Sequence, residues 1–294
     1  MRHRDVAVVG PGRVGTAVAQ ALVRGGHRVV AAADGGGGSA QRLADQVAGC
    51  RVASDAPTAV SDAGTVLLTV PDDALEAVVA EVARADGWRE GQHVVHCSGA
   101  RGTEVLRLAA LAGARVAACH PAQTVPAGAD ADALLGVPWV VTCDDVDREW
   151  AEDLVAATGG DPFALADGAR TLYHAGLTIG SNAAAAAVAV ARQLLLAAGV
   201  DAPARILTPL AEASVRNTAT DGAAALTGPV VRGDAGTVAG HLEALDVDVP
   251  RLAQAYRALQ GVVLDQVTAG LDPDVAARLT DLLADGREDP PWNG

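Results

Sequence analysis

Short runs of apolar and β-branched residues alternate with amphipathic stretches through the first half of the chain. The apolar runs predict strands, and the stretches with apolar positions three and four residues apart predict helices. The predicted strands are Val6–Val9, Arg28–Ala33, Thr65–Val70, His93–Cys97, Arg115–Cys119 and Trp139–Thr142. The predicted helices are Val14–Arg24, Ala40–Val47, Leu75–Ala85, Glu104–Ala112 and Arg148–Ala157. This alternation is typical of a parallel sheet covered by helices on both faces.

The pattern changes after residue 166, where the strand-like runs stop and only helical periodicity remains. A change of period of this kind marks a domain boundary. We expect a long helix over 169–198, a helix that Pro203 opens, and helices over 237–245, 250–269 and 273–284. The sequence therefore predicts an α/β domain with a doubly wound sheet over 1–166 and an all-α domain over 167–294.

The longest apolar stretch, residues 171–191, has no charged side chain and is long enough to cross a membrane. It also carries His174, Ser181 and Asn182 among many alanines. A helix that is small and apolar on nearly all sides is typical of the centre of a soluble domain. We therefore expect this helix to be buried, and we expect no membrane partner.

The turn between the first predicted strand and the first predicted helix has the pattern GxGxxG. Gly10 permits a tight turn, Gly12 lets a pyrophosphate approach the backbone, and Gly15 lets the helix pack closely on the strand. The free N–H groups and the dipole at the start of that helix favour an anion. The motif therefore predicts a Rossmann domain that binds a dinucleotide; the alternative is a glycine-rich turn without function. The residues assigned to the phosphates are Gly10, Pro11, Gly12, Arg13, Val14 and Gly15.

Asp34 follows the second predicted strand, at the place where an acidic residue binds the ribose hydroxyl of NAD. An enzyme that uses NADP is expected to offer an arginine there, whereas this chain continues with Gly35–Gly38. The predicted cofactor is therefore NAD or NADP, with NAD slightly favoured. The alternative is that the glycine loop lets Arg42 or Arg13 reach the 2′-phosphate of NADP.

Small and polar residues also stand at the ends of the other predicted strands. Ligands of open α/β sheets lie across the carboxyl ends of the strands. Thr69, Val70 and Pro71 lie at the end of the third predicted strand, so we expect them to contact the cofactor. Ser98 and His120 follow the next two strands, so we expect them near the nicotinamide, with Ser98 binding the substrate.

Charge and composition narrow the class of partner and of chemistry. The chain has 22 basic and 36 acidic residues, a net charge of -14, which disfavours nucleic acid and anionic membranes. All the basic residues are arginine, so mechanisms that need a catalytic lysine are excluded. The cysteines form no CxxC pair and no histidine lies at metal-ligand spacing, so we predict no metal site. Unpaired thiols and an N-terminal apolar run too short for a signal peptide predict a cytoplasmic protein.

Six stretches carry a resemblance to known proteins: VVGPGRVGTA (8–17), TVPDDAL (69–75), HCSGA (96–100), HPAQT (120–124), YHAGLTIGSN (173–182) and LTGPVVRGDAGTVAGHL (226–242). Together they resemble the NAD(P)-binding oxidoreductases that pair a Rossmann-like domain with a helical C-terminal domain of unknown function. The resemblance spans nearly the whole chain. That family is similar in architecture to pyrroline-5-carboxylate reductases, ketopantoate reductases and the 6-phosphogluconate and 3-hydroxyisobutyrate dehydrogenases.

The resemblance implies a homodimer built on the helical domain, which is expected to be 6-phosphogluconate dehydrogenase-like. It also implies hydride transfer to a C=O or C=N group beside a carboxylate. The 6-phosphogluconate and 3-hydroxyisobutyrate enzymes carry a lysine four residues before an asparagine on the central helix, whereas here Thr178 stands four residues before Asn182. The acid must therefore be another side chain or water.

His120 is the first candidate for the general acid or base, because an imidazole titrates near neutral pH. Its His-Pro setting resembles that of prephenate dehydrogenases. His174, Thr178 and Asn182 are spaced by four residues and so share one helix face, with Ser181 beside them. We expect His174 to shuttle a proton, and Asn182 and Ser181 to orient the substrate. The alternatives are a structural histidine bonded to backbone and a polar contact between the domains.

Arg232 is the candidate for binding a substrate carboxylate, because a guanidinium matches a carboxylate with two hydrogen bonds. In a dimer its loop could serve the partner's site; the alternative is a surface arginine on a helix connection. The sequence therefore predicts a dimeric NAD(P)-dependent oxidoreductase that moves hydride to or from a small carboxylate-bearing keto, hydroxy or imino compound. The competing prediction is a dinucleotide-binding regulatory protein without turnover.

Overall fold

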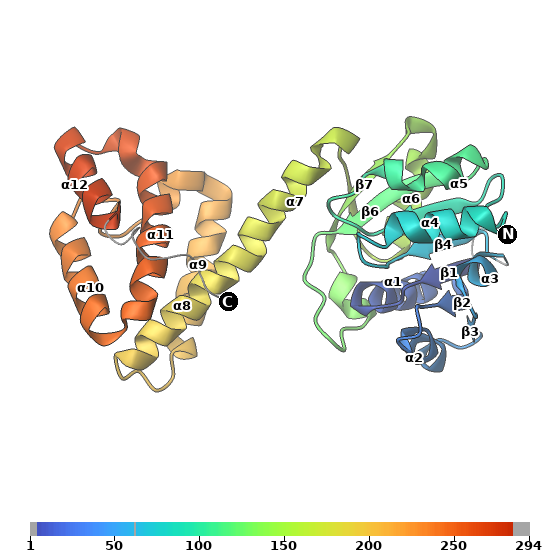
Figure 1. Cartoon of the computed structure of the whole chain (residues 1–294), viewed down its shortest axis with the longest axis horizontal. Coiled ribbons are helices and arrows are strands. Elements are labelled where there is room, and N and C mark those ends of the chain that lie inside the picture. The colour runs from blue at the N-terminus through green and yellow to red at the C-terminus, as the bar shows by residue number, and fades with distance from the viewer. Residues whose placement is uncertain (1–4, 62, 285–294) are drawn as a thin grey trace. The chain divides into compact units, whose positions relative to one another are not determined.

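The fold was analysed in a computed structural model that describes residues 5–61 and 63–284. The chain forms two compact units, Met1–Leu177 and Thr178–Gly294 (Figure 1). The first unit contains the whole sheet, and the second is helical within the described residues. The domain boundary predicted after residue 166 falls just behind the last strand, whereas the two units divide within the long helix that follows.

The sheet of the first unit has eight strands in the order β3-β2-β1-β4-β5-β6-β7-β8. All the strands expected from the sequence are present. Two more were not predicted, because β3 is two residues long and β8 contains a proline and is largely exposed. The strands are β1 (Asp5–Val9), β2 (Arg28–Ala33), β3 (Arg51–Val52), β4 (Thr65–Leu68), β5 (His93–His96), β6 (Arg115–Pro121), β7 (Pro138–Cys143) and β8 (Asp161–Ala164).

Strands β1 to β6 are parallel, and β7 pairs with β6 in the antiparallel direction. Because β1 lies between β2 and β4, the chain reverses its direction of winding there. Such a switch point leaves a crevice at the carboxyl ends of the strands. The segments after β1, β2, β4 and β5 and the end of β6 therefore meet at one edge of the sheet.

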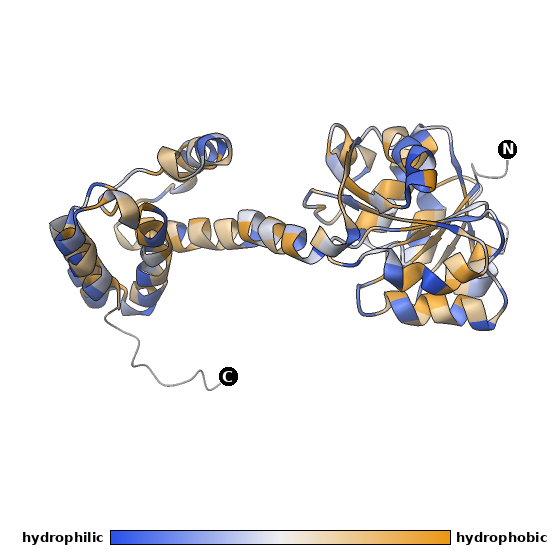
Figure 2. Cartoon of the chain, turned by 90° about the horizontal axis from the view of Figure 1, so that it is seen from above, coloured by the Kyte–Doolittle hydropathy of each residue, from blue (hydrophilic) through white to orange (hydrophobic). Residues whose placement is uncertain are grey.

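Helices cover both faces of this sheet. One apolar core joins the sheet to α1 (Arg13–Arg24), α2 (Ser39–Gln46) and α6 (Arg148–Ala157). A second core joins the other face to α3 (Ala56–Val60), α4 (Leu75–Arg84) and α5 (Arg107–Leu111). The strands are mostly apolar, and the helices carry polar residues on their outer sides (Figure 2). The doubly wound α/β fold is thus confirmed.

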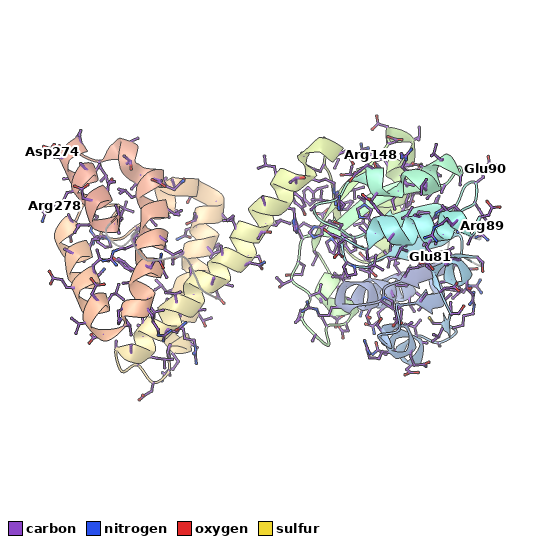
Figure 3. The ribbon with its side chains drawn as sticks, in the orientation of Figure 1. Glu81, Arg89, Glu90, Arg148, Asp274 and Arg278 are labelled. Carbon is purple, nitrogen blue, oxygen red and sulfur yellow. The ribbon has the colours of Figure 1, made fainter. Side chains whose placement is uncertain are left out.

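The second unit is built from α8 (Ala184–Ala197), α9 (Ala204–Asp221), α10 (Ala235–Asp248), α11 (Pro250–Val267) and α12 (Pro273–Ala284). Its core lies among α10, α11 and α12 and includes Val238, Leu264 and Leu279. On α12 the charged side chains of Asp274 and Arg278 point outward (Figure 3), and Leu279 points into the core. The predicted all-α domain is confirmed.

The long helix differs from the expectation in two ways. It consists of α7 (Arg170–Thr178), a π-helical turn (Ile179–Ala183) and α8, so its spacing is not that of a regular α-helix. None of the described residues of α8 or α9 is buried, so the prediction of a buried central helix is wrong for a single copy of the chain. Within the described part of the chain one helix, Asp167–Ala197, is long and apolar enough to cross a membrane, a test that core helices also pass.

Candidate active site

The turn after β1 has the geometry that a GxGxxG motif requires. Gly10 has φ +76°, which disfavours any side chain, and its N–H donates to Ala33 O at 2.8 Å. A Cβ at Gly10 would lie 2.5 Å from Cγ1 of Val70. The turn after β1 is thereby held against the segment after β4, as the predicted roles of Gly10 and Val70 require.

Gly15 brings α1 against the same segment. A Cβ at Gly15 would collide with Oγ1 of Thr69 and lie 3.2 Å from Gly10 O. The Thr69 hydroxyl donates to Gly10 O at 2.8 Å. Pro71, which follows, is exposed at this edge of the sheet. The structure thus brings together Gly10, Gly15, Thr69 and Val70, which the sequence predicted as cofactor-binding residues.

Gly12 differs from these two glycines because its side-chain position is open. The nearest atom to a Cβ there is Gly10 O, at 3.9 Å, and Gly12 is exposed. Helix α1 begins at the next residue, with no acidic residue in its first turn and, among the described residues, no side chain capping it. Its first N–H groups are therefore available to an anion. Arg13 is exposed beside them, Pro11 is buried, and Val14 packs on the core.

Asp34 supports its own loop. Its carboxylate accepts hydrogen bonds from Gly36 N–H at 2.8 Å, Ser39 Oγ at 2.7 Å and Ala40 N–H at 2.8 Å. These bonds, that from Ala40 above all, lower the pKa of Asp34 to about 2. The structure does not support a preference for NAD, because this carboxylate already closes the glycine loop and caps α2. Arg42 lies on α2 and its side chain donates to Gly37 O of the glycine loop at 3.3 Å.

His96 and Ser98 order the loop after β5. His96 is fully buried; its Nε2 donates to Gly102 O at 2.8 Å and its Nδ1 accepts from Ser98 N–H at 3.1 Å. Burial lowers the pKa of His96 to about 4. The Ser98 hydroxyl accepts from Arg101 N–H at 3.0 Å. Ser98, predicted to bind the substrate, is thus buried and takes part in the loop that holds Gly99.

Gly99 is the point where two histidines meet. A Cβ on Gly99 would lie 3.0 Å from Nε2 of His120 and 2.5 Å from Cδ2 of His174. The two imidazole rings are perpendicular, with centroids 6.1 Å apart. His120 lies at the end of β6 and His174 on α7, so the sheet edge and the helix converge here. The structure brings His120, His174 and the Ser98 loop together, as the sequence predicted.

Tyr173 completes this group, and it was not predicted. Its hydroxyl lies 2.9 Å from Nδ1 of His120, and the two rings are nearly perpendicular, with centroids 5.8 Å apart. Burial raises the pKa of Tyr173 and Arg170 opposes that rise. Burial, Arg170 and His174 lower the pKa of His120 to about 4. Both side chains are therefore neutral near pH 7.

Arg170 is the other residue that sequence reasoning missed. It is 1% exposed, and its guanidinium donates to Ser98 O, to Ala118 O and, at 3.0 Å, to Thr142 Oγ1. Among residues 5–61 and 63–284 it forms no salt bridge, and its Nε has no hydrogen-bond partner. One buried cation thus connects β6, β7 and the segment after β5 to the start of α7.

Ser181, Asn182 and Arg232 belong to the second unit. Ser181 and Asn182 lie in the π-helical turn, where the Ser181 hydroxyl is 3.4 Å from Oδ1 of Asn182. Turns of this kind are frequent at functional sites. Arg232 is exposed on a tight connection before α10, where its N–H donates to Gly228 O at 3.2 Å. The roles predicted for these three residues stay predictions.

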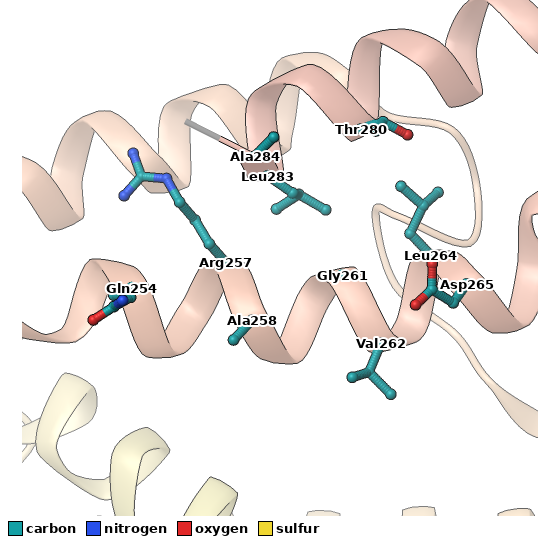
Figure 4. A pocket seen from close by; sticks show the side chains of 10 residues that line it. All are labelled: Gln254, Arg257, Ala258, Gly261, Val262, Leu264, Asp265, Thr280, Leu283 and Ala284. Atoms are coloured by element: carbon teal, nitrogen blue, oxygen red, sulfur yellow. The ribbon is translucent and has the colours of Figure 1, made fainter. Parts of the chain in front are cut away.

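A pocket of about 480 Å³ lies within the second unit, between α11 and α12 (Figure 4). Arg257 and Asp265 supply its charged side chains, and Arg257 also pairs with Asp246 of α10 at 3.4 Å. None of the residues predicted from the sequence lines this pocket. We therefore place the candidate active site at the sheet edge around Gly12 and His120.

Replacing Gly99 with alanine tests how closely the two histidines are held. The new methyl group must displace one or both rings, so we expect the free energy of unfolding to fall by about 1–3 kcal/mol. The histidine resonances of His120 and His174 are expected to shift. Denaturant unfolding and histidine NMR measure both effects. The control is Gly35→Ala, because a Cβ at Gly35 has no atom within 4 Å. Unchanged stability and unshifted resonances in Gly99→Ala would contradict the geometry.

A doubly wound sheet with this glycine turn, followed by a helical unit, defines the chain as a Rossmann-type protein with an all-α C-terminal domain. Two family models match it. The Rossmann-like domain matches residues 2–121, and the domain of unknown function DUF2520 matches residues 137–261. The chain is thus similar to Rossmann-like domains in its first part and to the DUF2520 domain in much of the rest. None of the curated proteins matches the sequence significantly.

Solved structures share the whole fold. A Bacteroides fragilis protein provisionally named an NADP oxidoreductase has a TM-score of 0.73 and 21% identity, over 88% of this chain and 97% of its own. An imine reductase from Myxococcus stipitatus, in complex with NADP+, has a TM-score of 0.70 and 17% identity, over 94% and 99%. A reductive aminase from Aspergillus terreus, in complex with NADPH and ethyl levulinate, has a TM-score of 0.63 and 18% identity, over 94% and 98%.

Proposed function

We propose that this protein is an NAD(P)-dependent oxidoreductase that transfers hydride between a nicotinamide and the C=O or C=N carbon of a small substrate. The observation that carries the proposal is the turn at Gly10–Gly15. At Gly10 and Gly15 the space that a Cβ would take is occupied by neighbouring atoms of the protein. At Gly12 that space is open, and it lies beside the free N–H groups at the start of α1. Such a turn fits a pyrophosphate. The structural neighbours that hold NADP+ or NADPH support this fit.

The chain's own residues supply binding and proton transfer, and the bound cofactor supplies the hydride. The first turn of α1 would hold the pyrophosphate, with Arg13 beside it. His120 is the proton carrier at the substrate heteroatom, because Tyr173 lies at its Nδ1 and its Nε2 lies beside Gly99 near the end of β6. The absence of lysine makes this histidine more important, since no ammonium group is available as an acid.

We propose a small carboxylate-bearing substrate, with Arg232 as the group that binds the carboxylate. Its guanidinium is exposed, and its loop is fixed by the hydrogen bond from its own N–H and by Asp234, which caps α10. Ser181 and Asn182 would orient the substrate from the π-helical turn. The imine reductase and the reductive aminase among the structural neighbours support a C=N group as the alternative reducible group.

We propose a homodimer through the helical unit. Helices α8 and α9 bury none of their described residues in one copy, although they carry many apolar side chains. Exposed apolar surface of this extent is typical of an interface. The exposed large side chains are Val188, Leu196, Ile206, Leu210 and Val215. The cytoplasmic location stays a prediction.

We propose NADPH as the preferred form of the cofactor, because Arg42 of α2 donates to Gly37 O of the glycine loop, where the ribose 2′-position of a bound dinucleotide falls. Titration of the protein with NADPH and NADH, followed by nicotinamide fluorescence, is expected to show tighter binding of NADPH. Arg42→Gln is expected to weaken NADPH binding about 10-fold and to leave NADH binding unchanged. Equal loss for both dinucleotides would contradict the assignment of Arg42.

Turnover is tested by NADPH oxidation with a panel of 2-oxo acids, cyclic imines and ketone–amine mixtures. Consumption of NADPH with any of them supports the oxidoreductase, and its loss in His120→Ala supports the site. Binding of neither dinucleotide would overturn the proposal. Tight binding without turnover on the whole panel would instead favour the second candidate function, a dinucleotide-binding regulatory protein, which the same Gly12 geometry supports.

A further inference from the structure

His120 has a different neighbour at each of its ring nitrogens. Nδ1 lies 2.9 Å from the hydroxyl of Tyr173, and Nε2 lies beside Gly99. Tyr173 and His174 are adjacent on α7: the tyrosine hydroxyl bonds to Nδ1 of the ring, and the His174 ring lies perpendicular to it with centroids 6.1 Å apart. The imidazole therefore stands between the Tyr173 phenol at Nδ1 and the buried Gly99 beside Nε2.

We propose that Tyr173 is the proton source of this site and that the His120 ring relays the proton, accepting one at Nδ1 as it releases another from Nε2. This inference rests on the proposed oxidoreductase function and adds the origin of the proton to it. Tyr173 acts through His120, so it is a positioning and relay residue, whereas His120 is the residue that meets the substrate.

The reductive step balances with these groups. Hydride from the bound cofactor joins the carbon of the C=N or C=O group, and the π electron pair moves to the heteroatom. The heteroatom takes the proton from Nε2 of His120. Nδ1 takes the proton from the Tyr173 hydroxyl, which leaves a phenolate. After the product leaves, a proton from water enters at Nε2 and Nδ1 returns its proton to the phenolate, so the ring regains its starting tautomer. The ring starts and ends neutral, as its lowered pKa of about 4 requires near pH 7.

A phenolate needs a nearby positive charge, and Arg170 supplies it. The Arg170 guanidinium is 1% exposed and forms no salt bridge among the described residues, although the charges of Asp167 and Glu104 act on it. Its charge acts to lower the pKa of Tyr173 against the effect of burial. The other groups whose charges act on His120 are His174 on α7, Asp72 after β4 and His96 on β5. Asp72 alone among them favours a protonated ring.

The second unit contains a matched pair. The Tyr256 hydroxyl lies 2.8 Å from Nδ1 of His241, with the rings perpendicular and their centroids 5.8 Å apart. Burial raises the pKa of Tyr256, as it does for Tyr173. The chain contains two tyrosines. Tyr256→Phe therefore removes the same hydrogen bond elsewhere, and it leaves Tyr173 as the remaining tyrosine for spectroscopy.

The first experiment measures the tautomer of His120 by NMR of the full chain labelled with 15N-histidine, near pH 7. A relay from Tyr173 requires the phenol to donate to Nδ1, so Nε2 must carry the ring proton. We expect that tautomer in the wild type and in Tyr256→Phe, and a change of the His120 signals in Tyr173→Phe. A ring protonated at Nδ1 in the wild type would overturn the relay. This measurement does not depend on turnover, so it stands even if no substrate is found.

The second experiment compares kcat with a cyclic imine or 2-oxo acid that the wild type reduces. Tyr173→Phe is expected to lower kcat about 100-fold, to leave the Kd of NADPH unchanged and to change the pH profile of kcat. Tyr256→Phe is expected to match the wild type in all three. NADPH binding without an effect of Tyr173→Phe on kcat or its pH profile would overturn the relay and leave the proposed function intact. A wild-type protein that does not bind NADPH would overturn the proposed function itself.

Discussion

Gly12→Ala is expected to leave the protein folded and as stable as the wild type, and to weaken the binding of a nicotinamide dinucleotide about 100-fold. A Cβ at Gly12 meets no atom closer than 3.9 Å, so the added methyl group causes no collision within the chain. It would occupy the space through which a pyrophosphate reaches the first N–H groups of α1. Loss of two charge-assisted hydrogen bonds costs about 3 kcal/mol, or about 100-fold in Kd.

The matched variant is Gly15→Ala. A Cβ at Gly15 collides with the Thr69 side chain and lies 3.2 Å from Gly10 O, so this change must displace α1 from the segment after β4. We expect Gly15→Ala to lose both stability and binding, whereas Gly12→Ala loses binding alone. Thermal unfolding of the apo protein and fluorescence titration with NADPH separate the two. A Gly12→Ala protein that binds NADPH normally would show that the turn does not hold the cofactor.

The glycine turn is also the part of the site that the sequence predicted best. Its residues are consecutive, and each glycine is needed for a local reason: a tight turn, the approach of a pyrophosphate or close packing of the helix. The structure places Gly10 against Val70 and Gly15 against Thr69. Compared with the sequence prediction, it adds only which residues these glycines contact. A motif that depends only on residues close in sequence can be predicted without knowledge of the fold.

The proton-transfer group could be predicted only in part. His120 was found because it ends a predicted strand, and His174 because it interrupts an apolar stretch. Tyr173 lies next to His174 but gave no separate signal, since its role depends on a hydrogen bond across 53 positions of the chain. Arg170 resembled a polar residue at the start of a helix, and its burial accompanies hydrogen bonds to β6, to β7 and to the segment after β5.

Asp34 and the long helix show how a correct local observation led to a wrong or unsupported conclusion. The carboxylate does stand after β2, but its hydrogen bonds go to Gly36, Ser39 and Ala40, which no strand pattern predicts. The apolar stretch does form a helix, but one copy of the chain leaves α8 unburied. For α8, we propose that the partner subunit of the homodimer buries the apolar surface.

Arg170→Met is expected to have the other large effect, because the guanidinium is the common donor for Ser98 O, Ala118 O and Thr142. Methionine fills a similar volume but leaves these acceptors without a donor. Removal of the buried charge offsets part of the loss, so we expect the free energy of unfolding to fall by about 2–4 kcal/mol. Arg28→Met is the control, since the pair of Arg28 with Asp5 is exposed and contributes about 0–1 kcal/mol. Denaturant unfolding measures both.

The same variant changes the proton chemistry in a direction that a purely structural role for Arg170 does not explain. Its charge is the second largest cause, after burial, of the low pKa of His120, so Arg170→Met must raise that pKa from about 4 toward 6.5. In the wild type the unfolded chain binds protons at His120 before the folded chain does, so stability falls as pH decreases from about 6.5 to about 4. Arg170→Met is expected to reduce that loss, as histidine NMR titration and unfolding at several pH values can show. An unchanged His120 pKa would mean that Arg170 only holds β6, β7 and the segment after β5 together, and the phenolate at Tyr173 would then have no counter-charge.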